Sequence, residues 1–271
     1  MKSSFLTRGG VPSDTEESEV LIGEEEEQGD PAAFLNEGEM TVTTPAADAK
    51  VSLTVSDKGV LASASDHSAM VRKEVTVTDL NSDGILTYDE ALVAAHKVYN
   101  SADGYATAAY GNGVSVTKLW GVSADSSLFY LNGKGLESNV ADTEKSTVKE
   151  GDTLYAAILQ DTTYYSDRYA SFDADTKEVK AGEDVTLTLT AGGKGAAAVP
   201  VGTWNNGSFT ALEGKTTNEN GQVTVSFDQA GTYLVTAKGT VKDTVTTDLS
   251  TGATEEKDCP IMAPSCILTV T

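Results

Sequence analysis

The fold of the first half of this 271-residue chain is decided by residues 73–90, Lys73-Glu-Val-Thr-Val-Thr-Asp-Leu-Asn-Ser-Asp-Gly-Ile-Leu-Thr-Tyr-Asp-Glu90. Residues 73–78 are rich in β-branched side chains that alternate with charged or polar ones, which predicts a strand. Residues 88–99 place apolar side chains at helical spacing, which predicts a helix. The sequence between them therefore predicts a tight strand-to-helix connection.

Residues 79–90 match the pattern D-x-[DN]-x-[DN]-G-x₅-E, the calcium loop of an EF-hand, at every defined position. Ca²⁺ takes six to eight oxygen ligands, and Gly84 stands where such a loop must turn with positive φ. The predicted ligands are Asp79, Asn81, Asp83 and Glu90 through their side chains, Ile85 through its backbone carbonyl and Thr87 through a water.

The same loop has a simpler interpretation, in which Asp and Asn hydrogen-bond their own backbone and cap the next helix. The complete match, with apolar Leu86 and acidic Glu90, favours calcium. A strand precedes the loop and no second loop follows, so we expect a solitary structural ion rather than a cooperative sensor. Extracellular Ca²⁺ would fill such a site even at a Kd of about 10⁻⁴–10⁻³ M.

The composition narrows the class of protein. The formal net charge is −22, the pI is about 4.3, and the 19 Lys and Arg residues are scattered. Nucleic acid is not an expected partner, because phosphate binding needs clustered basic side chains. No run of about 18 apolar residues is present, so we expect no membrane insertion. No nucleophile with a base, and no open metal site, can be assembled from the motifs, so we do not expect an enzyme.

The two ends of the chain suggest a fragment. Residues 1–40 contain eleven acidic and two basic side chains, which predicts a disordered acidic tail. Residues 1–8 lack the apolar core of a secretory signal, and residues 266–271 read as a final strand with no anchor after it. Since the composition is that of a β-rich extracellular protein, we expect a piece of a longer secreted or cell-surface protein.

The strand and turn pattern predicts two domains after the tail. Residues 41–170 read as an α+β domain with one main helix, and residues 171–271 as an all-β sandwich. Residues 104–113, rich in Gly, Ala and Tyr, read as a loop. Expected strands cover residues 50–55, 60–62, 74–78, 114–120, 128–131 and 153–159 in the first domain, and lie within 178–190, 221–227, 231–237 and 266–271 in the second.

Four segments of the first domain resemble the transcobalamin-C-terminal-like domain of unknown function, found in surface proteins of gut Firmicutes. They are Glu74–Gly84, Asp89–His96, Phe129–Gly133 and Val148–Asp152, and the resemblance covers roughly residues 49–166. It implies a β-grasp-like sheet with one helix. Cobalamin binding is not carried over, because no corrin-contacting position can be matched.

The second domain is similar to bacterial Ig-like domains of adhesins. The similarity is carried by Asn220-Gly-Gln-Val-Thr-Val-Ser-Phe227 and by Ala230-Gly-Thr-Tyr-Leu-Val-Thr-Ala237, and it covers about residues 178–271. It implies an Ig-like β-sandwich. Such sandwiches serve many roles, so the similarity says little about function.

The only two cysteines, Cys259 and Cys266, are seven residues apart. In an oxidising compartment they would close an eight-residue ring, a constraint that stabilises by roughly 2.5 kcal/mol in the loop-entropy model. Two unpaired thiols are the alternative. The spacing matches neither a CxxC redox motif nor a zinc site.

These features together predict a non-enzymatic, calcium-binding modular surface protein that serves as an adhesion or spacer module. One alternative is an adhesin that binds carbohydrate or a host surface protein, and another is an accessory module of a larger surface enzyme. Flat aromatic rings suit such contacts. The aromatic candidates are Trp120, Trp204, Tyr105, Tyr110, Tyr164, Tyr165 and Tyr169, of which Trp120 is expected inside a strand. Asp173 and Asp175 are either a second calcium site or a solvated turn.

Overall fold

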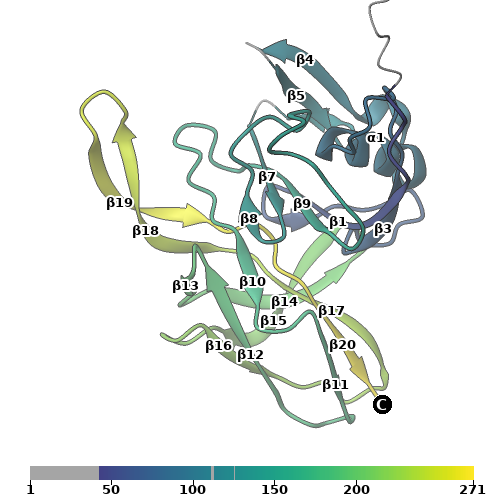
Figure 1. Cartoon of the computed structure of the whole chain (residues 1–271). Helices are drawn as coiled ribbons and strands as arrows, with labels where there is room; N and C mark the ends of the chain where they lie inside the picture. Colours follow the sequence, from purple (N-terminus) through teal and green to yellow (C-terminus); the bar gives the residue numbers. More distant parts are fainter. Residues whose placement is uncertain (1–42, 111–112, 125) are drawn as a thin grey trace, which may run out of the picture. The chain divides into compact units, whose positions relative to one another are not determined.

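The computed structural model describes residues 43–110, 113–124 and 126–271 (Figure 1). The predicted acidic tail, residues 1–40, lies outside the described residues. Residues 43–271 form one compact unit. Within it, one large hydrophobic core draws on residues 49–158 and another on residues 170–270.

A mixed sheet organises the first half. The strands form the order β2-β1-β9-β7-β8, with β3 also paired to β1. The parallel pair β1 and β9 lies at the centre, and the other pairs are antiparallel. The bounds are β1 Ala49–Asp57, β2 Val60–Leu61, β3 Lys73–Val77, β7 Ser127–Leu131, β8 Lys134–Gly135 and β9 Thr153–Ile158.

The helix α1, Tyr88–Tyr99, follows β3 as the sequence predicts. Thr87 is its N-cap, and Thr87 and Glu90 form a reciprocal capping box. The apolar face formed by Ala91, Leu92 and Ala95 is fully buried in the same core as the inward side of β1. Burial of this face fixes the helix against the sheet.

The segment that follows α1 differs from the predictions. A 3₁₀ turn, η1 Ala102–Gly104, leads into a three-stranded sheet of β4 Ala106–Tyr110, β5 Gly113–Leu119 and β6 Val122–Ser123. The predicted loop at residues 104–113 is therefore wrong over β4, because pairing with β5 imposes the extended form on a segment of weak intrinsic preference. Trp120 was expected inside a strand, but it lies in the turn between β5 and β6.

The second half is a β-sandwich. One sheet contains β10 Ala170–Phe172, β12 Val185–Ala191, β13 Lys194–Gly195 and β16 Gln222–Val225. The other has the order β11-β20-β17-β14-β15, with bounds Thr176–Val179, Cys266–Val270, Gly231–Ala237, Pro200–Asn205 and Ser208–Thr216. Both sheets contribute buried side chains to one core. This strand order is Ig-like, with β20, β17 and β14 in the places of G, F and C.

Tyr233 adds a local mark of the Ig-like arrangement. Its hydroxyl donates to the backbone carbonyl of Gln229 at 3.0 Å, and its ring stacks on Phe227 with centroids 4.0 Å apart. A tyrosine near the start of strand F that bonds back to the chain a few residues upstream is the tyrosine corner of Ig folds. Val235 stands two residues later, where antibody domains carry a cysteine.

A long hairpin between β17 and β20 has no counterpart in the predictions. It consists of β18 Thr240–Asp248 and β19 Ala253–Pro260, drawn in olive to yellow in Figure 1. These two strands pair only with each other among the described strands. The hairpin is anchored at its base, where Arg168 forms an ion pair with Asp243 at 2.6 Å.

Two small apolar clusters join the halves. Tyr155, Ala157 and Leu159 pack with Met262, and Leu61 and Val71 pack with Ala263 and Trp204. Both clusters therefore combine side chains from the first sheet with the segment that precedes β20. This apolar contact accounts for residues 43–271 forming one compact unit.

The two cysteines lie near the end of β19 and at the start of β20. Both thiols are free and buried, and the Cys259 Sγ lies 3.7 Å from the carbonyl oxygen of Lys257. Cys266 lies in the sandwich core, and burial raises the pKa of its thiol. A disulfide between them stays a prediction, with two unpaired thiols as the alternative.

Candidate functional site

The backbone of the 79–90 loop has the turn that its sequence predicts. Ser82 and Gly84 both have positive φ, at 59° and 85°. The incoming chain lies directly over this turn, because a Cβ on Gly84 would stand 3.1 Å from Thr43 Cγ2 and 3.2 Å from the Thr44 carbonyl oxygen. Gly84 is therefore required both by its φ and by this close approach.

Asp79 is one of two buried acids of the loop, with 7% of its surface exposed. Its Oδ2 accepts the backbone N–H groups of Ala46 and Gly84 at 2.9 and 2.8 Å, and its Oδ1 accepts that of Asp83 at 3.2 Å. These bonds, that from Ala46 foremost, hold the pKa of Asp79 below its ordinary value. The carboxylate is therefore ionised at neutral pH although it is buried.

Glu90 is equally enclosed, with 6% of its surface exposed. Its Oε1 accepts the backbone N–H of Leu80 at 2.7 Å, and its Oε2 accepts that of Thr87 at 2.8 Å. Glu90 thus joins the start of the loop to the start of α1. Among the described residues, neither Glu90 nor Asp79 forms an ion pair with a basic side chain.

The remaining predicted ligands lie nearer the surface, apart from Thr87. Asn81 is exposed and donates from its amide to Asp83 Oδ2 at 2.9 Å, while Asp83 Oδ1 accepts the N–H of Ile85 at 2.8 Å. Thr87 is buried and its hydroxyl lies 3.1 Å from Glu90 Oε2. In the part of the chain that the structure describes, no three acidic, His or Cys side chains converge as they do around a bound ion.

The predicted ligand atoms are nevertheless of the type that a hard cation prefers. They are all oxygens, which Ca²⁺ requires, and two of the carboxylates are buried without a cationic side chain. In this arrangement, backbone N–H groups stabilise the negative charge of the two carboxylates in place of a counter-ion. These hydrogen bonds are also those that the helix-capping interpretation of the loop expects. The bond from Ala46 was not foreseen from the sequence, because nothing in residues 43–46 resembles a ligand.

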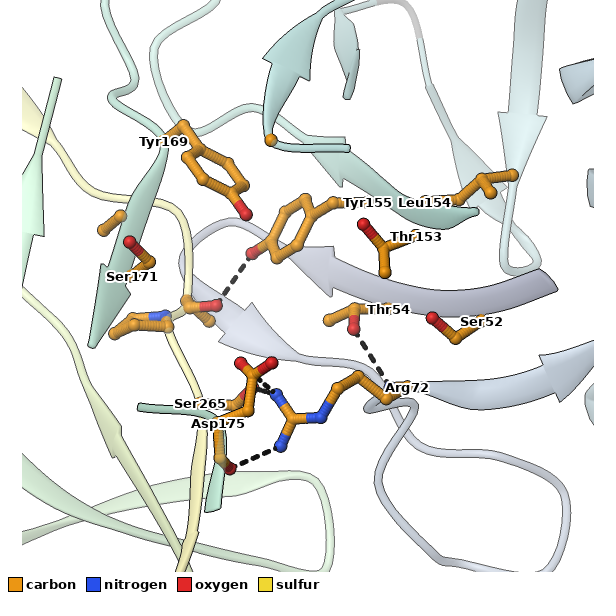
Figure 2. A pocket seen from close by; sticks show the side chains of 14 residues that line it. Ser52, Thr54, Arg72, Thr153, Leu154, Tyr155, Tyr169, Ser171, Asp175 and Ser265 are labelled. Carbon is orange, nitrogen blue, oxygen red and sulfur yellow. Dashed lines mark hydrogen bonds and ion pairs between the residues drawn. The ribbon is translucent and has the colours of Figure 1, made fainter. Parts of the chain in front are cut away.

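A second site lies where the halves meet, in a pocket of about 120 Å³ (Figure 2). Arg72 donates to the Asp175 carboxylate and carbonyl at 2.9 and 2.8 Å, and the Tyr155 hydroxyl donates to the Ala263 carbonyl at 2.8 Å. Tyr169 stacks on Tyr130 with ring centroids 4.6 Å apart. These contacts occupy the groups that would bind a ligand, so the junction pocket is a structural joint.

The expected aromatic surface is divided by the fold. Tyr169 packs at the junction, whereas Tyr164 and Tyr165 of the same connector are exposed. Asp173 and Asp175, considered as a second calcium site, instead pair with Lys177 and Arg72 at 3.2 and 2.9 Å.

His96 ties α1 to the β5–β6 turn from inside the core. It is 1% exposed, its Nδ1–H donates to the Leu92 carbonyl at 2.7 Å, and its Nε2 accepts the backbone N–H of Trp120 at 2.9 Å. The Tyr105 ring lies 5.0 Å from the imidazole. Burial lowers the pKa of His96, so the folded protein keeps this imidazole neutral.

We expect this histidine to make the protein acid-sensitive. Because the folded pKa lies below the unfolded value of about 6.5, the unfolded state binds the proton first and stability falls as pH drops below about 6.5. Urea unfolding at pH 7.5 and 5.5 measures this. His96→Gln should remove part of the loss, whereas His67→Asn on the surface should keep it. An equal pH dependence in both variants would contradict the assignment.

Comparisons with known proteins leave the family open. No protein-family model matches the chain, so the resemblance to the transcobalamin-C-terminal-like domain stays a prediction. No curated protein matches it either.

Among solved structures, the chain is similar to the N-terminal four Ig domains of Dscam1 isoform 4.4, with 10% identity, a TM-score of 0.21, and coverage of 82% of this chain and 43% of that one. It is also similar to the D0-D1 domain of intimin, with 14% identity, a TM-score of 0.22, and coverage of 80% and 96%. The chain spans less than half of the Dscam1 structures that it matches. TM-scores this low do not establish a shared fold, so the Ig-like description rests on the strand order and the tyrosine corner.

Proposed function

We propose that this chain is a non-enzymatic, calcium-binding module of a cell-surface or secreted protein, acting in adhesion or as a spacer. The main observation in support is a pair of buried carboxylates, Asp79 and Glu90. Both accept hydrogen bonds from the backbone of the 79–90 loop, and neither forms an ion pair with a basic side chain among the described residues. A Ca²⁺ ion held by the 79–90 loop would neutralise them and pin the β3-to-α1 connection. The ion is structural in this proposal and takes part in no reaction.

The architecture supports a role as a module. The first half, with the order β3-β1-β9-β7, a parallel central pair and one helix, agrees with a β-grasp-like domain. The second half is an Ig-like sandwich, and the junction clusters fasten it to the first. Two domains fixed to each other in this way hold a defined distance, which suits a spacer or a platform for adhesion. No helix among the described residues is long and apolar enough to span a membrane.

Thermal melting in calcium and in chelator tests the proposal. At a calcium concentration ten times Kd, binding stabilises by about 1.4 kcal/mol. For a unit of this size that is a rise in Tm of roughly 3–6 °C. Glu90→Gln should abolish the rise, because glutamine still serves the capping box but brings no charge to the ion.

The control is Glu137→Gln, which removes an exposed acid far from the loop in sequence and should keep the full calcium effect. Melting curves of the unmodified chain that coincide in calcium and chelator would refute calcium binding and leave the loop as a helix cap.

A further inference from the structure

A groove of about 540 Å³ shares no lining residue with the pocket described above. Its walls come from both halves of the chain. They are the β1–β2 turn and β2 with its following residues, the C-cap of α1, the β5–β6 turn, the β14–β15 turn and the segment after β17. The lining residues used below are Asp57, Lys58, Asn100, Trp120, Gly207 and Lys238; we call this the Trp120 groove.

Trp120 is held in an unusual backbone conformation. With Gly121 it forms a two-residue hairpin loop in which both residues have positive φ, at 54° and 84°. Asn and Gly are the usual residues in such turns, and a bulky residue at positive φ is strained. His96 Nε2 accepts its backbone N–H, and its indole N–H donates to the Ser63 carbonyl at 2.6 Å. Strain of this kind, held in place by neighbouring bonds, is typical of ligand sites.

Two lysines without partners converge on the same groove. Lys58 and Lys238 are exposed, and among the described residues neither forms an ion pair. The turn that carries Lys58 packs against the stem of Lys238, since a Cβ on Gly59 would stand 3.9 Å from Lys238 Cγ. In a chain with a net charge of −22, this is a local excess of positive charge.

Asp57 and Asn100 also line the groove. The Asp57 Oδ1 atom is buried and has no hydrogen-bond partner among the described residues. Because this oxygen is closed to solvent, a ligand in the groove does not reach it, and the lysines and Asn100 are the polar groups open to a ligand. Asn100 adds an amide to the same lining.

We propose that the Trp120 groove binds a short glycan that carries a carboxylate. The sugar ring stacks on the Trp120 indole, Lys58 and Lys238 hold the carboxylate, and the Asn100 amide hydrogen-bonds a hydroxyl. Sites for small ligands commonly lie at domain junctions and combine an apolar wall with a few polar groups. The proposal goes beyond the calcium module and does not depend on it, because no lining residue of the groove except Asn100 lies within ten residues of the 79–90 loop, and none belongs to it.

Titration of the full chain, followed by ¹H–¹⁵N NMR, tests this inference. The probes are methyl β-glucuronide and methyl β-glucoside, which share a ring and differ by the carboxylate. We expect the glucuronide to shift the Trp120 indole N–H and to bind roughly tenfold more tightly than the glucoside. Lys58→Gln combined with Lys238→Gln should erase that preference, whereas Lys134→Gln on the β7–β8 hairpin should not.

Trp120→Asn should weaken both sugars, because Asn accepts positive φ and keeps the turn while the stacking ring is lost. Three results would overturn the proposal: no shift of groove signals with either sugar, affinities that the lysine pair does not change, or acetate binding as tightly as the glucuronide. The titrations are done both in calcium and in chelator. Glycan binding is therefore tested separately from calcium binding, and the absence of calcium binding would not affect the test.

Discussion

Gly221→Ala should be among the most damaging single substitutions in the sandwich, lowering the free energy of unfolding by roughly 2–5 kcal/mol. Gly221 has φ +77°, and a Cβ there would collide with the Leu189 carbonyl oxygen and approach the Ala196 backbone nitrogen at 2.9 Å. The left-handed backbone costs an alanine about 1–2 kcal/mol, and overpacking against backbone adds about 1–3. Chemical denaturation measures the sum.

Gly193→Ala is the matched control for this prediction. Gly193 lies in the same half at φ +80°, but a Cβ there would meet nothing within 4 Å. It should therefore lose only the backbone part, about 1–2 kcal/mol. Equal losses in the two variants would show that β12 does not lie against the turn at Gly221 as described.

Tyr155→Ala should cost about 3–5 kcal/mol, the range for removing a large buried aromatic side chain. Tyr155 is 8% exposed, packs with Met262 and with the rings of Tyr130 and Tyr169, and donates its hydroxyl to Ala263. Because it belongs to the junction, its loss should also separate the unfolding of the two halves into two transitions. Denaturation followed by calorimetry reports both effects.

Two further variants define the junction. Tyr155→Phe keeps the ring and should cost only about 0.5–1.5 kcal/mol, the net value of one hydrogen bond. Tyr165→Ala, whose side chain is 55% exposed, should change little. If Tyr155→Ala lowered the free energy of unfolding no more than Tyr165→Ala and unfolded in a single transition, this cluster would not be what holds the two halves together.

The local parts of the fold were predictable because they follow from adjacent residues. Alternation predicts β3, helical spacing predicts α1, and the loop pattern predicts the positive φ at Gly84. The N-cap at Thr87 is a finding of the structure, because the sequence predicts a water ligand there. The strands that flank Asn-Gly and Ala-Gly turns in the sandwich were predictable for the same reason.

Other features depend on contacts that no local pattern carries. The hairpin of β18 and β19 has charged and Thr-rich strands with little apolar alternation. Arg72 meets Asp175 across 103 residues, and Ala46 reaches Asp79 across 33. The alternation of residues 114–120 predicts a strand that includes Trp120, but hydrogen bonds to His96 and Ser63 hold it in a turn instead.

The candidate metal site was likewise predictable only in part. The sequence predicts which oxygens stand in the loop, and the structure adds that two carboxylates are buried and held by backbone N–H groups. Calcium binding stays the central proposal of the account.

Isothermal titration of the full chain with CaCl₂ tests that proposal most directly. We predict binding at one site per chain, with the heat of binding lost in Glu90→Gln and kept in Glu137→Gln. No heat of binding up to millimolar calcium, or equal heats in the unmodified chain and Glu90→Gln, would contradict it.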